Sequence, residues 1–209
     1  MAYTLQEQEE IDGFKHFWKS GGAILCALIV IAAIGYFGWT IYQSHQKNEQ
    51  AKAGNIFNEF VTQIQGNNIE AADKQFNILL TEHQGSPSTA GASLIKAGYL
   101  FNEKKYEDAR KNLEWVLTNN KEPLFQALAT QRLALVYLQE QKYNEALETI
   151  NKPVDPNFDS VMLDIKGDIY AAQGKSKEAK EAYNMALAKM TDDVPGKELI
   201  ELKRDQQGQ

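Results

Sequence analysis

An uninterrupted apolar stretch near the amino terminus constrains this chain more than any other feature of its sequence. Residues 21–42 contain no charged side chain, and no Asp, Glu, Lys or Arg occurs between Lys19 and Lys47. As a helix these residues would span about 33 Å, which is enough to cross the hydrocarbon core of a bilayer. Aromatic residues lie at both ends of the stretch, as they do at the two interfaces of a membrane. The sequence therefore predicts a single transmembrane helix over residues 21–42.

The tail of residues 1–20 argues against a cleaved signal peptide. A signal peptide begins with net positive charge, whereas this tail contains four acidic residues, and no small-x-small cleavage site follows the apolar stretch. Ile11, Phe14, Phe17 and Trp18 fall on one face of a helix. We expect this tail to be a short amphipathic helix that lies at the membrane surface.

Charge near the apolar stretch gives only a weak prediction of its orientation. Lys15 and Lys19 lie on the amino side, and Lys47 and Lys52 lie on the carboxyl side, so the positive-inside rule returns almost a tie. On this basis we favour a cytoplasmic amino terminus.

Composition and motifs exclude several functions. Lys plus Arg is 22 and Asp plus Glu is 28, so the formal net charge is −6 and the chain is a poor general nucleic-acid binder. The one cysteine, Cys26, lies in the apolar stretch, which excludes an intramolecular disulfide and a soluble catalytic thiolate. The three histidines share no helix face, and the chain has no phosphate loop, GxGxxG or GxSxG motif. We expect no catalytic residue, no metal and no cofactor.

The region after the apolar stretch is built from repeats. Apolar residues recur there at helical spacing, and equivalent alanines follow one another at 37, 37 and 33 residues. Small residues lie twelve positions before the last three of these alanines. The pattern resembles the tetratricopeptide repeat, in which small residues let two helices pack closely. The expected repeat-packing residues are Ala97, Ala134 and Gly167 on the first helices and Ala109, Ala146 and Ala179 on the second. We predict an all-α fold, in which a tetratricopeptide-repeat-like helical-hairpin solenoid over residues 43–190 follows the transmembrane helix.

Both ends of the repeat region depart from this pattern. A first, degenerate unit around Ala72 has Phe60 in place of a small residue, and its first helix is expected to continue from the apolar stretch through Gln43–Ile64. Residues 191–209 are predicted to form a C-terminal capping helix with a frayed end. This helix is expected to begin at Asp192–Pro195, with the proline in its first turn, and to cover the solenoid with three apolar side chains, Leu199, Ile200 and Leu202.

Proteins with such repeats bind partners in the concave groove that the first helices line. By register the groove positions are Leu94, Gly98 and Phe101, then Leu128, Gln131, Leu135 and Leu138, and then Val161, Asp164, Asp168 and Ala171. Many of these are apolar, so one hypothesis is that the groove holds a partner helix or an extended apolar segment. The alternative is that the C-terminal helix or another part of the chain already fills it.

The layout as a whole resembles the YfgM family, the ancillary subunits of the bacterial Sec translocon. The residues that carry the resemblance are FKHFWK at 14–19, GYFGW at 35–39 and SHQ at 44–46, together with the degenerate repeats and the closing helix. The resemblance implies a single-pass inner-membrane protein with residues 1–20 in the cytoplasm and the repeats in the periplasm. It also implies association with the Sec translocon channel and a PpiD-like periplasmic chaperone, to assist newly translocated proteins.

The sequence is also compatible with two other functions. One is a cytoplasmic-facing repeat adaptor for a signalling or division protein, and the other is a holdase that binds clients directly in the apolar groove. A homodimer is also open, because Ala23 and Ala27 form a small-xxx-small pair that allows two spans to pack. The other explanation for this pair is that both alanines face lipid.

Overall fold

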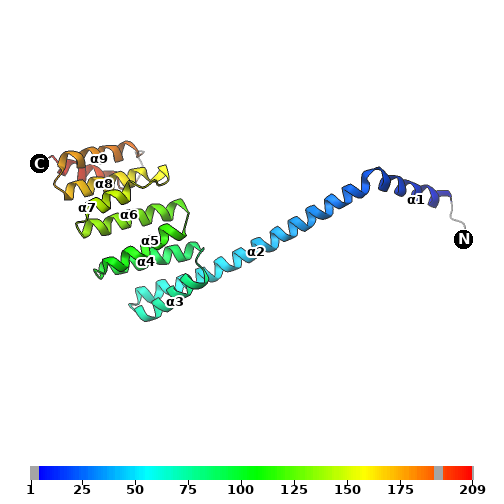
Figure 1. Cartoon of the computed structure of the whole chain (residues 1–209), viewed down its shortest axis with the longest axis horizontal. Helices are drawn as coiled ribbons and strands as arrows, with labels where there is room; N and C mark the ends of the chain where they lie inside the picture. The colour runs from blue at the N-terminus through cyan, green and yellow to red at the C-terminus, as the bar shows by residue number, and fades with distance from the viewer. Residues whose placement is uncertain (1–4, 191–194, 209) are drawn as a thin grey trace. The chain divides into compact units, whose positions relative to one another are not determined.

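The computed structural model describes residues 5–190 and 195–208, and its regular structure is helical throughout (Figure 1). No described residue lies in a strand, so the prediction of an all-α fold is confirmed. The chain divides into two compact units, Met1–Ala51 and Lys52–Gln209, which are described separately. The elements are α1 (Leu5–Phe17), a π-helical turn (Trp18–Gly22), α2 (Ala23–Gln65), α3 (Ile69–Glu82), α4 (Pro87–Asn102), α5 (Tyr106–Asn119), α6 (Pro123–Gln139), α7 (Tyr143–Ile150), a 3₁₀ turn (Pro156–Phe158), α8 (Asp159–Ala172), α9 (Ser176–Ala188) and α10 (Lys197–Gln206).

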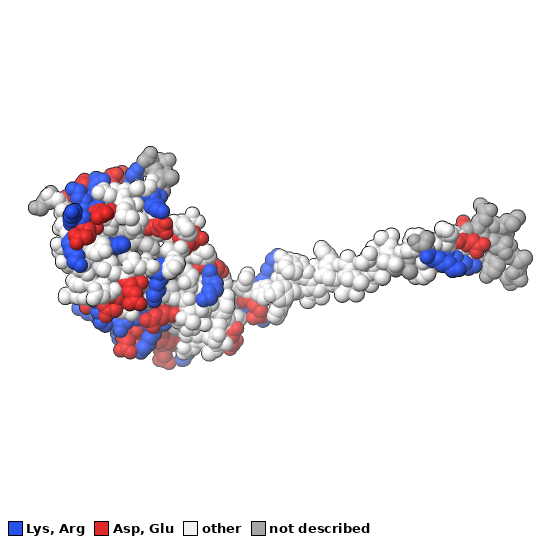
Figure 2. All heavy atoms as spheres, turned by 45° about the horizontal axis from the view of Figure 1, so that its top comes forward, with Lys and Arg blue, Asp and Glu red and all other residues white. Residues whose placement is uncertain are grey.

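In the first unit, the amino-terminal part of α2 has the length and composition of a membrane span. The helix from Ile24 to Gln65 contains a window apolar enough to cross a bilayer, and none of that window is buried. A core helix of a soluble domain would be mostly buried, so this exposure favours a span. Figure 2 shows no Lys, Arg, Asp or Glu along this part of the helix. As predicted, residues 43–64 continue in the same helix.

The π-helical turn between α1 and α2 ends in two glycines, Gly21 and Gly22. Gly21 has φ +112°, a left-handed conformation that favours glycine. The Phe17 ring lies so close to Gly22 that a Cβ atom there would be 2.3 Å from it. The helix α1 covers residues 5–17 of the predicted tail, and Ile11, Phe14 and the Phe17 ring are exposed on it. The regular helix α2 begins after this turn, at Ala23, two residues after the first residue of the predicted span.

The second unit is a stack of helical hairpins. The same kind of turn joins the two helices within each hairpin. Each turn holds a residue with positive φ five positions before the repeat alanine: Asn67 (56°), Lys104 (62°), Gln141 (60°) and Gly174 (73°). The following backbone N–H donates to the carbonyl five residues back, as Lys105 does to Leu100 at 2.9 Å. The same bond closes the other three turns, at Asn68, Lys142 and Lys175. The degenerate unit at Ala72 therefore shares the register of the full repeats.

The small residues lie where the helices of a hairpin approach one another. All six of the predicted repeat-packing residues are buried. Gly167 shows why size matters there, because a Cβ atom would lie 2.3 Å from the ring of Tyr183, which is itself only 2% exposed. In the degenerate unit the buried ring of Phe60 packs instead on Phe76, with 5.7 Å between ring centroids. In this unit an aromatic pair thus fills the space between the two helices. In the full repeats small residues let the two helices pack more closely.

The C-terminal helix α10 packs on α9 but differs in detail from the prediction. It begins at Lys197 after Gly196, so Pro195 precedes the helix and is not in its first turn. The expected cap residues Asp192 and Asp193 lie outside the described residues. Only Ile200 of the three expected apolar contacts is buried, at 7% exposure, whereas Leu199 and Leu202 are 56% and 55% exposed. A single apolar anchor therefore holds α10, and polar contacts provide the rest.

Candidate functional site

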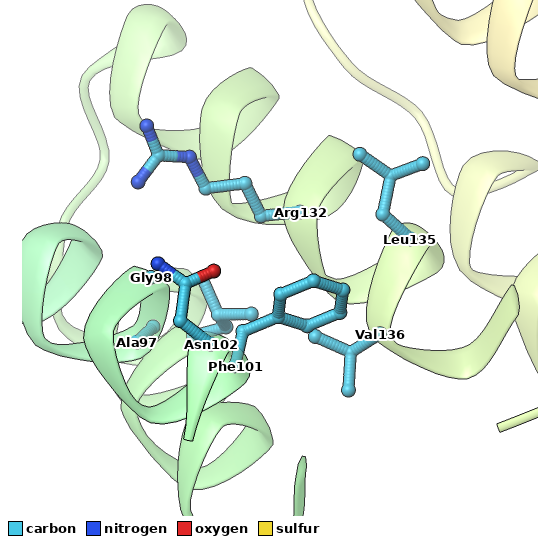
Figure 3. A pocket seen from close by; sticks show the side chains of 8 residues that line it. Ala97, Gly98, Phe101, Asn102, Arg132, Leu135 and Val136 are labelled. Carbon is cyan, nitrogen blue, oxygen red and sulfur yellow. The ribbon is translucent and has the colours of Figure 1, made fainter. Parts of the chain in front are cut away.

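A pocket opens between α4 and α6, the first helices of two successive hairpins. Its volume is about 280 Å³. The lining is mainly apolar, with two polar side chains, and comprises Ala97, Gly98, Phe101, Asn102, Leu113, Arg132, Leu135 and Val136 (Figure 3). A pocket of this size accommodates one or two side chains of a partner more readily than a drug-sized ligand.

Local sequence explains why the space exists. Nothing lies within 4 Å of the position that a Cβ atom on Gly98 would take, so the glycine leaves the wall of α4 open. The Phe101 ring is held against Tyr106 of α5, with 5.5 Å between ring centroids. Figure 3 shows Phe101 directed toward Val136 and Leu135 of α6. The pocket is thus a preformed opening between ordered side chains.

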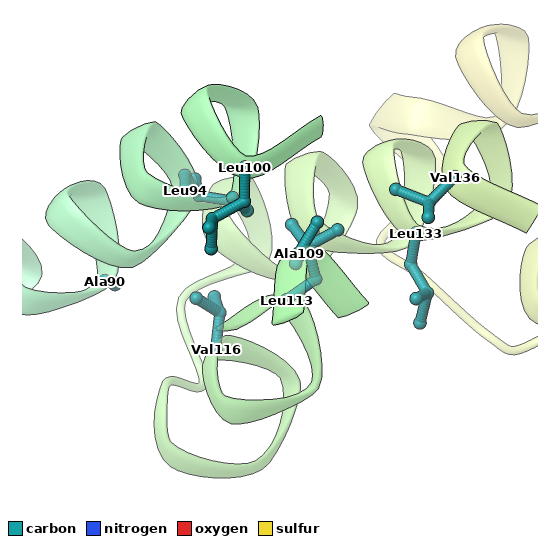
Figure 4. Packing of buried hydrophobic residues seen from close by; sticks show 10 residues of the cluster. Ala90, Leu94, Leu100, Ala109, Leu113, Val116, Leu133 and Val136 are labelled. Atoms are coloured by element: carbon teal, nitrogen blue, oxygen red, sulfur yellow. The ribbon is translucent and has the colours of Figure 1, made fainter. Parts of the chain in front are cut away.

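The base of the pocket is part of a tightly packed core shared by α4, α5 and α6 (Figure 4). Leu113 is 1% exposed and Val136 is 2% exposed, so both are fixed by their neighbours. This core also contains Leu94, which is only 4% exposed. Register predicts Leu94 on the groove surface, and that prediction is wrong because its side chain packs inward, in the same core as Leu100 and Val116.

Arg132 supplies the cationic group of the pocket. Its guanidinium donates one hydrogen bond, of 2.9 Å, to the carbonyl oxygen of Leu94. A guanidinium carries five N–H donors, so others remain for the backbone or a carboxylate of a bound segment. Register predicts the adjacent Gln131 and not Arg132. Neighbouring residues on a helix point about 100° apart, so an error of one position selects a side chain that faces elsewhere.

The predicted groove residues do not form one continuous open surface. Gly98, Phe101 and Leu135 line the pocket together. The other predicted positions are partly buried and do not line it: Leu128, Gln131, Leu138, Val161, Asp164, Asp168 and Ala171. Among these, Asp164 and Asp168 are occupied by another part of the chain.

Lys203 of α10 closes the groove at the last hairpin. Its Nζ atom lies 2.9 Å from Oδ1 of Asp164 and 2.9 Å from Oδ2 of Asp168. The hydroxyl of Tyr183 donates to Oδ1 of Asp168 at 2.8 Å. Relative to the repeat-packing residues, Asp164 and Asp168 correspond to Leu94 and Gly98. Lys203 therefore reaches α8 from the helix that follows α9, and Arg132 reaches α4 from the helix that follows α5.

The ionisation of this cluster follows from burial and from the bonds within it. Burial raises the pKa of Asp164, and the bond from Lys203 only partly opposes that effect. Burial lowers the pKa of Lys203, but the bonds to Asp168 and Asp164 outweigh it, so the pKa lies above its usual value. Burial and the bond to Asp168 raise the pKa of Tyr183. At neutral pH Lys203 is therefore a cation and Tyr183 is a neutral donor.

No group of three or more His, Cys, Asp or Glu side chains in the described part of the chain is arranged to hold a metal ion. The lining of the pocket suits binding, because it is apolar with a guanidinium and an amide at its edge. The class of protein that such a site and this helical-hairpin stack define is a repeat scaffold that binds other polypeptides.

Comparison with known proteins agrees with this class. A family model described as a tetratricopeptide repeat-like domain matches residues 15–209. A relative from Neisseria gonorrhoeae named "Ancillary SecYEG translocon subunit" is 41% identical over 209 residues, which cover 98% of this chain and 99% of the relative. A relative with the same name from Haemophilus influenzae is 26% identical, over 89% of this chain and 91% of its own length. Another, from Escherichia coli, is 22% identical, over 87% of this chain and 87% of its own length. The chain belongs to the YfgM family of ancillary SecYEG translocon subunits, which is non-enzymatic.

Proposed function

We propose that this protein is a membrane-anchored scaffold that associates with the Sec translocon and assists newly translocated proteins. The name shared by its relatives supports the translocon as a partner, and the exposed apolar part of α2 supports the anchor. The observation that carries the proposal is the open pocket between α4 and α6, because it leaves apolar surface accessible inside a repeat domain.

The pocket is proposed to bind one apolar side chain of a partner segment. Phe101, Leu135 and Val136 provide the apolar contacts, and Arg132 holds the backbone or a carboxylate of the same segment. Fully burying one large apolar side chain stabilises a complex by about 1.5–3 kcal/mol. A single anchor of this size suits a partner that must be released again after each transfer.

The proposal places the amino terminus in the cytoplasm and the repeats in the periplasm. A PpiD-like chaperone is then the proposed second partner, since the family resemblance implies one on that side of the membrane. A phosphatase reporter that is active only in the periplasm, fused after Gln209, tests the orientation. Activity is expected, whereas an inactive reporter would remove secreted clients from consideration and favour the cytoplasmic adaptor.

Co-purification of the full chain with the translocon tests the pocket. Leu135→Asp places a carboxylate in the apolar lining, and the recovered translocon is expected to fall about tenfold. The matched control is Leu124→Asp, on the same helix, because Leu124 is 52% exposed and does not line the pocket. If Leu135→Asp has the thermal unfolding curve of the wild type and retains the same partners, the pocket is not the binding site.

The same apolar pocket also favours a second candidate, direct binding of unfolded clients. The two functions differ in what they bind. A holdase suppresses the aggregation of a reduced, unfolded test protein, and Leu135→Asp would abolish that suppression. A scaffold instead binds folded partners and leaves the aggregation rate unchanged.

A further inference from the structure

The second helix of the middle repeat ends early. The helix α7 has 8 residues, whereas its equivalent α5 has 14. In the 37-residue register, Lys152, Pro153 and Val154 stand where α5 has Trp115, Val116 and Leu117. Proline lacks a backbone N–H and clashes with the preceding turn, so the helix stops at Ile150.

The missing turns leave a notch at the ends of α7, α8 and α9. Its volume is about 340 Å³. In the preceding hairpin, Trp115 and Leu117 of α5 pack against the core at the equivalent place. Here Ile150 and Met162 are buried and Val154 packs on the same core, but Met185 at the edge of the apolar floor is 52% exposed. The floor consists of Ile150, Val154, Met162, Leu163 and Met185.

The rim of the notch is positively charged. Three lysines line it, Lys152, Lys166 and Lys189, against a single carboxylate, Asp159. Asp159 pairs with Lys189 at 3.0 Å. Lys152 and Lys166 form no ion pair within the described part of the chain. Among the described residues, two lysines without an ion pair therefore flank the notch, in a chain whose formal net charge is −6.

A neighbouring hollow shares Lys166 and Met185 with the notch. Glu178 and Glu181 also line this hollow. Neither carboxylate forms an ion pair with Lys166 in the described structure. The apolar stems of the lysines extend the floor while their ammonium groups stay in water.

We infer that this notch is a second docking surface, which binds a polypeptide segment that carries large apolar side chains between carboxylates. The apolar side chains would replace the missing turns of α7 on the floor. The flanking carboxylates would pair with Lys152 and Lys166 at the rim. This surface shares no lining residue with the pocket between α4 and α6, so one partner can occupy each.

Fluorescence anisotropy on the full chain in nanodiscs of phosphatidylcholine tests this inference. The probe is a labelled peptide, Gly-Asp-Glu-Leu-Phe-Asp-Glu-Gly. One control peptide carries amides in place of its carboxylates, and a second carries serines in place of Leu-Phe. The acidic apolar probe is expected to bind about tenfold more tightly than either control.

Charge reversal then locates the site. Lys152→Glu combined with Lys166→Glu is expected to weaken the probe about tenfold, and Met185→Ser is expected to weaken it as well. The matched control combines Lys121→Glu with Lys177→Glu, two exposed lysines that do not line the notch. This control introduces the same change in net charge and should alter binding by less than about twofold.

Three outcomes would overturn the inference. One is equal binding of the acidic and amide peptides, and another is an equal effect of the notch and control charge reversals. The third is a dimer, seen by mass photometry, that Met185→Ser dissociates while the probe fails to bind. That result would assign the notch to a second copy of the chain. Because no readout involves the translocon, failure here leaves the role of the α4–α6 pocket unaffected.

Discussion

The two ends of the concave surface use equivalent positions in opposite ways. At the first full hairpin, Gly98 leaves space, and the pocket beside it stays open. At the last hairpin the equivalent residue is Asp168, whose carboxylate binds Lys203 of α10. The backbone register is the same in both. The residue at this position is therefore glycine beside an open pocket in one hairpin and an aspartate bound to α10 in the other.

The closed end should respond most strongly to a change of charge. Lys203→Glu would place a third carboxylate beside Asp164 and Asp168, whose side chains are only 20% and 23% exposed. We expect the free energy of unfolding of the second unit to fall by about 3 kcal/mol. Urea unfolding of the full chain, followed by circular dichroism, measures this. Lys177→Glu, on an exposed site of α9, should change it by less than about 0.5 kcal/mol, and equal effects would contradict the comparison.

Two glycines test the packing side of the comparison. Gly167→Ala would push a methyl group into the buried Tyr183 ring and disturb its bond to Asp168, which should destabilise the fold by about 1–3 kcal/mol. Gly98→Ala meets no atom within 4 Å and replaces glycine inside a helix, which should stabilise it by about 0.5–1 kcal/mol. Thermal unfolding of both variants measures the two signs. The comparison is wrong if the signs agree.

Alkaline pH should weaken the closed end. The pKa of Lys203 is raised in the folded state above its usual value of 10.5. Its contribution to stability is therefore fully present below pH 10.5 and is lost as the pH rises through the folded pKa. We expect the difference in unfolding free energy between wild type and Lys203→Met, about 1–2 kcal/mol, to shrink above that pH. If this difference in unfolding free energy stays constant from about pH 8 to about pH 11.5, the charge on Lys203 contributes nothing to stability.

The smallest expected effect concerns the turns of the same two hairpins. The open hairpin turns at Lys104 with φ 62°, and the closed one turns at Gly174 with φ 73°. A non-glycine residue is strained in this conformation, so Lys104→Gly should stabilise the fold by about 0.5–1 kcal/mol. Gly174→Ala should destabilise it by a similar amount. Replacing the adjacent Lys105, whose φ is −86°, with glycine should give no gain in thermal stability.

Much of the fold could be predicted from the sequence, because close helix packing restricts residue size. Ala109, Ala146 and Ala179 marked the register of the hairpins, and each is fully buried. The turn residues could not be recognised in the same way, since Asn, Lys, Gln and Gly occupy the four equivalent positions. Their conformation comes from the hydrogen bonds that close the turn, and only Asn67 and Gly174 suggest it by type.

The candidate site was less predictable than the fold. Register alone selected Gly98, Phe101 and Leu135, which line one pocket, but it also selected Leu94, which packs inward. The contact of Lys203 with Asp164 joins residues 39 apart in the chain, and no local pattern reveals it. Such pairings depend on where α10 docks, which the apolar residues of that helix indicated poorly.

The pairing of α10 with the last hairpin also bears on the length of the stack. One cation of the terminal helix, Lys203, contacts two carboxylates, Asp164 and Asp168. The equivalent residues are Gln131 and Leu135 in the hairpin before, and Leu94 and Gly98 in the first full one. Neither earlier hairpin offers a carboxylate to Lys203. The contact with α10 can therefore form only at the last hairpin. The charge pairing thus specifies which hairpin ends the stack, and a chain with one hairpin deleted would keep its end only if the last hairpin were retained.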